Sequence, residues 1–186
     1  MRFFEATHKY PFDWETVSLA SFRKYPNDKT PHVQHVEVLN QEIDPETGVL
    51  KTERLIMVKQ NAPRLMMKLL GGSDSSYVLE YSEVDPRDKT LTMHSTNLTF
   101  SNLLTVGEKI VYKPDPEDTK NSTLFAQSAK LSADGVLSRF SSYIEETCLK
   151  RFHDNALVGK LGLEQVLHKI LAEKRQERGG AGNMAA

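Results

Sequence analysis

The chain has almost no cysteine and almost no net charge. Cys148 is the one cysteine among 186 residues, which excludes an internal disulfide and a zinc site built from cysteines. The 24 basic residues nearly balance the 25 acidic residues, and the formal net charge is −1 at pH 7. The sequence therefore lacks the global positive field that concentrates a protein on nucleic acid. Any anion that this chain binds must be held by a local group of basic side chains.

Long apolar runs are also absent. No stretch approaches the roughly 18 consecutive apolar residues of a transmembrane helix. The first ten residues are mixed in charge and unlike an Arg-rich presequence, so we expect neither a membrane span nor a cleaved targeting segment. Apolar residues still make up 39% of the chain, which is enough for a hydrophobic core, and the length fits one domain of about 100 to 200 residues.

The sequence contains no pattern typical of a catalytic or metal site. The six histidines lack the spacing of metal ligands, and Gly71, Gly72 and Gly107 form neither a dinucleotide-binding nor a phosphate-binding loop. An enzyme of this size should show a nucleophile with its base, or a set of metal ligands. We therefore expect a binding protein that performs no covalent chemistry and needs no metal or cofactor.

Short β-branched and aromatic stretches alternate with turn sequences along the first two thirds of the chain. This pattern is typical of an antiparallel sheet. Tight connections such as 44–48 and 85–88 favour a meander over parallel βαβ units. The expected strands are residues 2–9, 32–43, 49–60, 76–85, 89–99, 103–113 and 122–133.

Two helices are expected beside this sheet. Asp13 has the position of an N-cap before a short helix. From about residue 133 to residue 178 apolar residues recur at helical spacing, with Phe140, Ile144 and Phe152 in one i+4 row. This apolar stripe predicts a long C-terminal helix that covers the sheet.

The length of the second helix predicts a bend within it. A straight helix of ~40 residues would be ~60 Å long, whereas a compact chain of this size has a radius of gyration near ~16 Å. We expect the bend or break at Gly159 and Gly162. Residues 176–186 are polar and then rich in Gly and Ala, which predicts a domain of residues 1–175 followed by a flexible tail.

The connection between the third and fourth expected strands, residues 61–72, is unusually apolar. Connections normally run exposed over the surface, yet this one combines Leu and Met with two basic residues. Such a segment suits a lid or contact with anionic lipid headgroups, and the alternative is a short helix packed on its own core. The expected lid and membrane contact consists of Pro63, Arg64, Leu65, Met66, Met67, Lys68, Leu69 and Leu70.

Two charged residues fall on strand faces that should point inward. The alternation places Arg54 and Glu108 among apolar residues of their strands. A buried charge is costly unless it is paired or hydrogen-bonded. The two residues therefore belong either to a structural ion pair or to a polar patch that meets a ligand headgroup inside a cavity. The expected cavity wall consists of Ile56, Val58, Val106, Glu108, Ile110, Phe140, Ile144 and Phe152.

Several short strings follow one another along the chain and cover nearly all of it. They are Lys24-Tyr25-Pro26-Asn27 followed by Pro31-His32-Val33, Thr52-Glu53-Arg54-Leu55-Ile56, Ser95-Thr96-Asn97-Leu98-Thr99, Tyr112-Lys113-Pro114 with Pro116 and Asp118, and Arg151-Phe152 with Asn155. In this order they resemble the landmarks of the PRELI/MSF1 domain, the family of the Ups, PRELI and slowmo lipid-transfer proteins. The sequence around Leu91-Thr92-Met93 and Asn102-Leu103-Leu104 resembles that of the slowmo branch of this family.

The resemblance implies an α+β fold in which a seven-stranded antiparallel sheet and helices, including a long C-terminal helix, enclose an apolar lipid cavity. It further implies a carrier that shuttles phosphatidylserine from the outer to the inner mitochondrial membrane across the intermembrane space, touching each membrane peripherally. The phospholipid would be cargo and not a cofactor, and a small twin-CX9C protein would be the partner in a heterodimer. Phosphatidic acid transfer by the same mechanism and a non-transferring mitochondrial adaptor are the alternatives.

The resemblance also implies which residues meet the headgroup. Lys24, Arg54 and Arg151 match basic positions of the family's pocket. Val58 and Val158, however, stand where phosphatidic acid carriers have lysines, although a lysine follows each within two residues. This departure favours a headgroup other than phosphatidic acid. The expected headgroup contacts are Lys24, Arg54, Lys59, Arg151 and Lys160.

Overall fold

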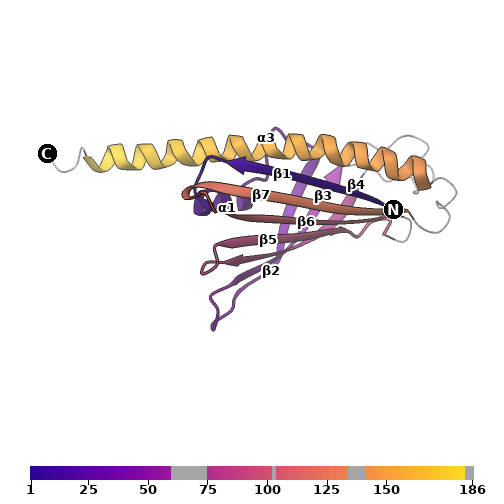
Figure 1. Cartoon of the computed structure of the whole chain (residues 1–186), viewed down its shortest axis with the longest axis horizontal. Coiled ribbons are helices and arrows are strands. Elements are labelled where there is room, and N and C mark those ends of the chain that lie inside the picture. The colour runs from indigo at the N-terminus through magenta and orange to yellow at the C-terminus, as the bar shows by residue number, and fades with distance from the viewer. Residues whose placement is uncertain (60–74, 102–103, 134–140, 183–186) are drawn as a thin grey trace.

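The computed structural model describes residues 1–59, 75–101, 104–133 and 141–182. Its elements follow one another along the chain as the alternation of turns and periodic stretches predicts. They are β1 (Arg2–Tyr10), α1 (Trp14–Phe22), β2 (Val33–Ile43), β3 (Leu50–Lys59), β4 (Ser75–Asp85), β5 (Thr90–Asn97), β6 (Leu104–Asp115), β7 (Asp118–Ala133) and α3 (Ser141–Gly182) (Figure 1).

The strands form one antiparallel sheet in the order β1-β7-β6-β5-β4-β3-β2. Strands β2 to β7 are a meander, and β1 completes the sheet by pairing with β7 from Arg2 opposite Leu131 to Tyr10 opposite Thr123. The predicted α+β class and the seven-stranded sheet are confirmed. The strand ends fall within two residues of their expected positions except at β7, which begins four residues earlier, at Asp118.

Helix α1 begins where the sequence predicts a cap. The Asp13 carboxylate accepts hydrogen bonds from the backbone N–H and the hydroxyl of Thr16, each at 2.8 Å. These bonds satisfy an N–H group that the first turn of a helix otherwise leaves unpaired. One turn of α1 is also tied to the sheet, because Nε1 of Trp14 donates to the carbonyl of Tyr112 at 3.2 Å.

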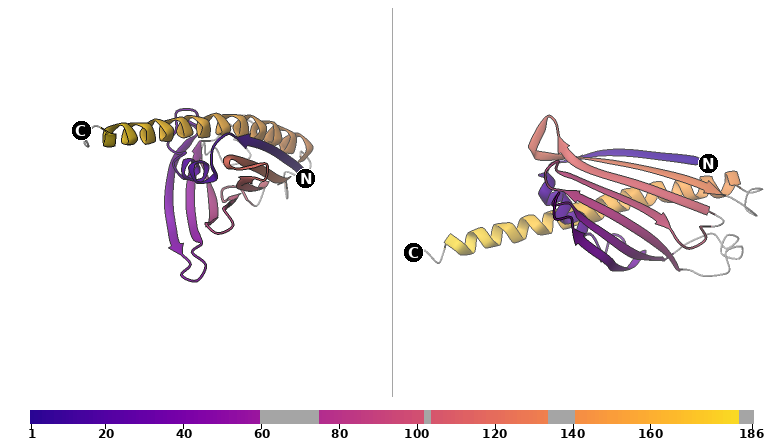
Figure 2. Two further views of the ribbon diagram at one scale, coloured as in Figure 1. Left: turned by 60° about the vertical axis from the view of Figure 1, so that its left-hand side comes forward. Right: turned by 90° about the horizontal axis from the view of Figure 1, so that it is seen from below.

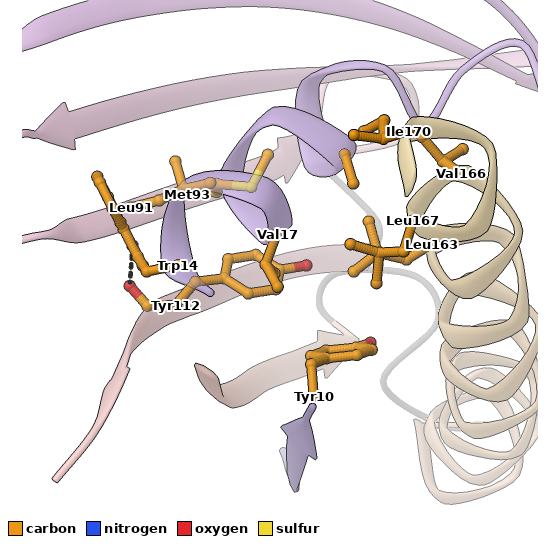
Figure 3. Packing of buried hydrophobic residues seen from close by; sticks show 11 residues of the cluster. Tyr10, Trp14, Val17, Leu91, Met93, Tyr112, Leu163, Val166, Leu167 and Ile170 are labelled. Atoms are coloured by element: carbon orange, nitrogen blue, oxygen red, sulfur yellow. Dashed lines mark hydrogen bonds between the residues drawn. The ribbon is translucent and has the colours of Figure 1, made fainter. Parts of the chain in front are cut away.

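The main apolar core lies where α1 packs between the sheet and α3 (Figures 2 and 3). Full burial of one such aliphatic or aromatic side chain contributes about 1.5–3 kcal/mol, so this cluster fixes α1 and the middle of α3 against the strands. Its members are Tyr10, Trp14, Val17, Ala20, Leu91, Met93, Tyr112, Leu163, Val166, Leu167 and Ile170.

Helix α3 is a single helix of 42 residues, so the predicted break at Gly159 and Gly162 is wrong. The two glycines are instead places where the connection from α1 to β2 closely approaches the helix. A Cβ on Gly159 would lie 3.0 Å from Nζ of Lys24, and a Cβ on Gly162 would lie 3.5 Å from the side chain of Asn27. Nδ2 of Asn27 also donates to the Gly162 carbonyl at 3.0 Å.

Part of the length of α3 projects beyond the sheet. Its C-terminal part extends past the strands (Figure 1), and the described side chains from Ala172 to Glu177 are exposed. The helix continues to Gly182, so residues 176–182, which the sequence assigns to a tail, are helical. Among the described residues, no helix is both long enough and apolar enough to cross a membrane.

Candidate functional site

A cavity of about 490 Å³ lies between the inner face of the sheet and α3. Its wall is mostly apolar, with aromatic residues such as Phe4 on β1 and Phe125 on β7. Six of the predicted cavity residues line it, namely Ile56, Val58, Val106, Glu108, Ile110 and Phe152. Phe140 and the side chain of Ile144, which were also predicted, lie outside the described residues.

A row of four polar side chains crosses the inner face of the sheet. Arg54 on β3 is opposite Glu80 on β4, Glu80 is opposite Ser95 on β5, and Ser95 is opposite Glu108 on β6. Directly opposed residues of neighbouring strands lie on one face of a sheet. All four residues accordingly line the cavity, and we call them the polar row.

The first two members of the polar row form an ion pair. Nε of Arg54 donates to Oε1 of Glu80 at 2.8 Å, and Nη2 donates to the same oxygen at 2.5 Å. The two residues are only 4% and 8% exposed. The Arg54 guanidinium also lies 5.4 Å from the ring centre of Phe22. Of the two interpretations that the sequence leaves open, Arg54 therefore matches the structural ion pair, although it lies in the cavity wall.

Glu108, at the other end of the polar row, has neutral partners. Nε2 of Gln127 donates to its Oε1 by a short hydrogen bond, and the hydroxyl of Ser95 donates to its Oε2 at 3.0 Å. The pKa of the Glu108 carboxyl is raised by its burial and, to a smaller extent, by the nearby charge of Glu80, although the two hydrogen bonds and the charge of Lys24 act in the opposite direction. Glu108 matches the second interpretation, a polar group inside a cavity.

Lys24, His8, His32 and Lys160 also line the cavity, and we call these four residues the basic group. Lys24 lies over the ring of Tyr25, with Nζ 5.3 Å from its centre. Burial, Lys24 and Arg151 lower the pKa of His32. Burial and Lys160 likewise lower the pKa of His8, against a weaker opposing effect of Glu164. The lysines thus supply the positive charge at neutral pH, and the two imidazoles are largely neutral.

Sequence comparison places this geometry in a known family. Residues 15–174 match the PRELI-like family. The chain belongs to this family. It is 42% identical to "Protein UPS2, mitochondrial" of Saccharomyces cerevisiae over 90% of this chain and 73% of that protein. It is 41% identical to a UPS-like protein of Schizosaccharomyces pombe over 91% of each chain. It is 36% identical to "Protein slowmo homolog" of Dictyostelium discoideum over 91% of this chain and 72% of that protein.

Solved structures share the fold of this PRELI-like chain at low sequence identity. The protein TTHA0849 of Thermus thermophilus superimposes with a TM-score of 0.62 at 14% identity, over 91% of this chain and 99% of that chain. The Zhui aromatase/cyclase of a Streptomyces species gives 0.58 at 15% identity, over 94% of each chain. A START superfamily protein of Mycobacterium smegmatis gives 0.51 at 13% identity, over 88% and 98%. The fold is START-like, and a shared fold does not by itself specify chemistry.

The five predicted headgroup residues fall into two groups in this PRELI-like structure. Lys24, Arg54 and Lys160 line the cavity. Lys59, in contrast, is exposed at the end of β3, and Arg151 on α3 is partly buried without lining the cavity. The predicted lid, residues 63–70, lies outside the described residues.

Sequence reasoning missed several polar residues of the cavity. Glu80, His8 and His32 are the most important of them. His8 alternates with Phe4 and Tyr10 on β1, and Glu80 alternates with apolar and small residues on β4, so the same two-residue period that identified Arg54 would have found both. Within the described ranges, no group of His, Cys, Asp and Glu residues has the arrangement of a metal site.

Proposed function

We propose that this protein carries a phospholipid between membranes in mitochondria. Membership in the PRELI-like family and the START-like fold are consistent with lipid transfer, and one relative is named mitochondrial. The observation that carries the proposal is the cavity, because its apolar wall is combined with the polar row and the basic group. An apolar cavity with a few converging polar groups is the usual form of a site that orients an amphipathic ligand.

The physical need for such a carrier follows from lipid solubility. Exposing a methylene to water costs about 0.8 kcal/mol, so a phospholipid with ~30 methylenes meets a barrier of roughly 20 kcal/mol when it leaves a bilayer unassisted. A protein that replaces water with apolar contacts removes most of that barrier. The carrier would act without breaking a covalent bond of the lipid.

We propose phosphatidylserine as the cargo, moved from the outer to the inner membrane across the intermembrane space. Lys24 and Lys160 supply positive charge for a phosphate, while the cavity also contains carboxylates that a headgroup with a cationic amine would complement. Phosphatidic acid, the alternative cargo, has only the phosphate. The lid at 61–72 and peripheral membrane contact remain proposals that rest on the sequence.

A vesicle assay tests the carrier function directly. Fluorescent phosphatidylserine and phosphatidic acid are loaded into donor vesicles, and their arrival in acceptor vesicles is measured with the protein present. Lys24→Gln should slow the transfer of both anionic lipids, whereas Lys109→Gln, an exposed lysine on the outward face of β6, should not. Native mass spectrometry should show one intact phospholipid per chain. Lipid hydrolysis would indicate an enzyme instead.

A heterodimer with a small twin-CX9C protein is the proposed working form. The outer face of the sheet offers exposed aromatic residues for such a partner, including Phe3, Tyr77 and Tyr81. Co-expression followed by size-exclusion chromatography tests this arrangement. If the complex forms but the protein contains no lipid and transfers none, the non-transferring adaptor is the correct description.

A further inference from the structure

The two acidic residues of the polar row differ in whether a positive charge neutralises them. Arg54 neutralises Glu80 through two hydrogen bonds to the same oxygen. Glu108 receives only neutral donors, the amide of Gln127 and the hydroxyl of Ser95. Within the described part of the chain, none of the ion pairs formed by Lys or Arg involves Glu108. A carboxylate in such surroundings gains stability from any cationic group that enters the cavity.

Glu108 has the capacity to bind such a group. A carboxylate accepts about four hydrogen bonds, two at each oxygen, and each oxygen of Glu108 accepts one from the protein. The residue lines the cavity and is only partly buried, because the cavity reaches it. One acceptor position on each oxygen is therefore available to a ligand that donates N–H bonds.

The charges around Glu108 complement a headgroup with both signs of charge. Lys24 lines the same cavity and is close enough for its charge to act on the Glu108 carboxyl. A lysine suits a phosphate oxygen and a carboxylate suits an ammonium group. Phosphatidylserine and phosphatidylethanolamine present both groups a few bonds apart.

We propose that Glu108 is the acceptor for the primary ammonium of the lipid headgroup, so that the cavity selects amine-bearing phospholipids. This inference rests on the carrier function proposed above and names the residue that sets its specificity. Specificity arises from rejection as well as from attraction. Phosphatidic acid has no ammonium and brings a second phosphate charge, which the Glu108 carboxylate disfavours.

The alternative is that Glu108 only holds Gln127 and Ser95 in place. Glu108→Gln distinguishes the two roles, because glutamine has the same shape and retains an acceptor oxygen but carries no charge. Glu5→Gln is the matched control, since Glu5 is exposed on the outward face of β1. Thermal unfolding of each variant verifies that it is folded.

The experiment is a competition in which donor vesicles contain equal amounts of labelled phosphatidylserine, phosphatidylethanolamine, phosphatidylglycerol and phosphatidic acid. Glu108→Gln should lower the transfer of the two amine-bearing lipids relative to phosphatidylglycerol by about tenfold, which corresponds to about 1.4 kcal/mol. Transfer of phosphatidic acid should stay the same or rise. An equal decrease for all four lipids, or no change in the ratios, would overturn the inference.

The same comparison can be made on the ligand, which keeps the test independent of variant folding. N-acetylation of phosphatidylserine removes the ammonium, so the unmodified protein should transfer the acetylated lipid about as poorly as the Glu108→Gln variant transfers phosphatidylserine. The two changes should not add, because they remove the same interaction. Equal transfer of the acetylated and native lipids by the unmodified protein would contradict the role of Glu108. If the unmodified protein transfers no lipid at all, the carrier function itself fails.

Discussion

Lys24 and Gly159 meet at a point where α3 has no side chain. A Cβ added to Gly159 would lie 3.0 Å from Nζ and 3.9 Å from Cε of Lys24. This approach is closer than a Cβ normally tolerates, so the lysine reaches its place in the cavity wall because residue 159 is a glycine. A glycine within a helix lowers stability by roughly 0.5–1 kcal/mol relative to alanine. At position 159 this lower helix stability is coupled to the space that the ammonium group of Lys24 occupies.

The first prediction concerns this contact. Gly159→Ala should leave the free energy of unfolding unchanged or raise it by up to ~1 kcal/mol, because the flexible end of Lys24 can shift. Transfer of anionic lipid should fall by up to about tenfold, the loss of one charge-assisted hydrogen bond. Gly162→Ala is the matched control, since its Cβ would meet Asn27 and Thr30 at the ordinary distance of 3.5 Å. Equal transfer by both variants would show that Lys24 is not positioned in this way.

The second prediction concerns the buried ion pair of Arg54 and Glu80. Arg54→Ala should lower the free energy of unfolding by about 3–5 kcal/mol, because it leaves the Glu80 carboxylate buried without its partner. The double variant Arg54→Met with Glu80→Leu should recover most of that loss, since no charge remains. Urea denaturation of the single and double variants measures both values. A double variant as unstable as Arg54→Ala would mean that packing, and not charge, decides the effect.

The third prediction concerns the cap of α1 and its dependence on pH. Burial alone would raise the pKa of Asp13, but its hydrogen bonds from Thr16, aided by Lys174, outweigh burial and hold the pKa below the ordinary 3.8. A carboxyl whose pKa is lowered in the folded state stabilises the protein above its unfolded pKa and loses this effect as the pH falls through the folded pKa. Asp13→Ala should therefore cost about 1 kcal/mol at pH 7.

The pH dependence separates this cap from a general packing effect. The difference in unfolding free energy between the unmodified protein and Asp13→Ala should shrink as the pH falls below 3.8. Asp13→Asn retains a capping side chain without the charge and should lose less stability at pH 7. A difference that stays constant from pH 7 to pH 3 would rule out the contribution of the carboxylate.

The fourth prediction rests on the sequence of the connection 61–72. Changing Met66, Met67 and Leu69 to serine should abolish vesicle-to-vesicle transfer, because the segment would lose its apolar contact with lipid. If this segment serves transfer and is not part of a packed core, the melting temperature should remain within a few degrees of the unmodified value. Unimpaired transfer would remove the lid from the mechanism.

The parts of this structure that depend on local periodicity could be predicted from the sequence. Alternation with a period of two residues predicted the strands and the inward orientation of Arg54 and Glu108. The N-cap at Asp13 predicted the start of α1. These patterns depend only on residues that are close together in the sequence, so they can be read without knowing how the elements pack.

Features that depend on distant pairing could not be predicted. The polar row requires the register of four strands to be known together, and a slip of one residue at any of them would turn its side chains to the opposite face. Glu80 was consequently not recognised as the partner of Arg54. The predicted break at Gly159 and Gly162 has the same origin. These glycines contact Lys24 and Asn27, which are far away in the sequence, so local sequence could not show why glycine occupies the two positions.

The pairing of β1 with β7 sets the order in which the molecule can be assembled. Arg2 lies opposite Leu131, so β1 has no partner during synthesis until more than a hundred further residues have been made. Contacts of such wide separation slow folding, because a long loop must close before they form. Helix α3, which roofs the cavity, follows later still. The cavity therefore exists only after α3 has been synthesised and has packed on the sheet.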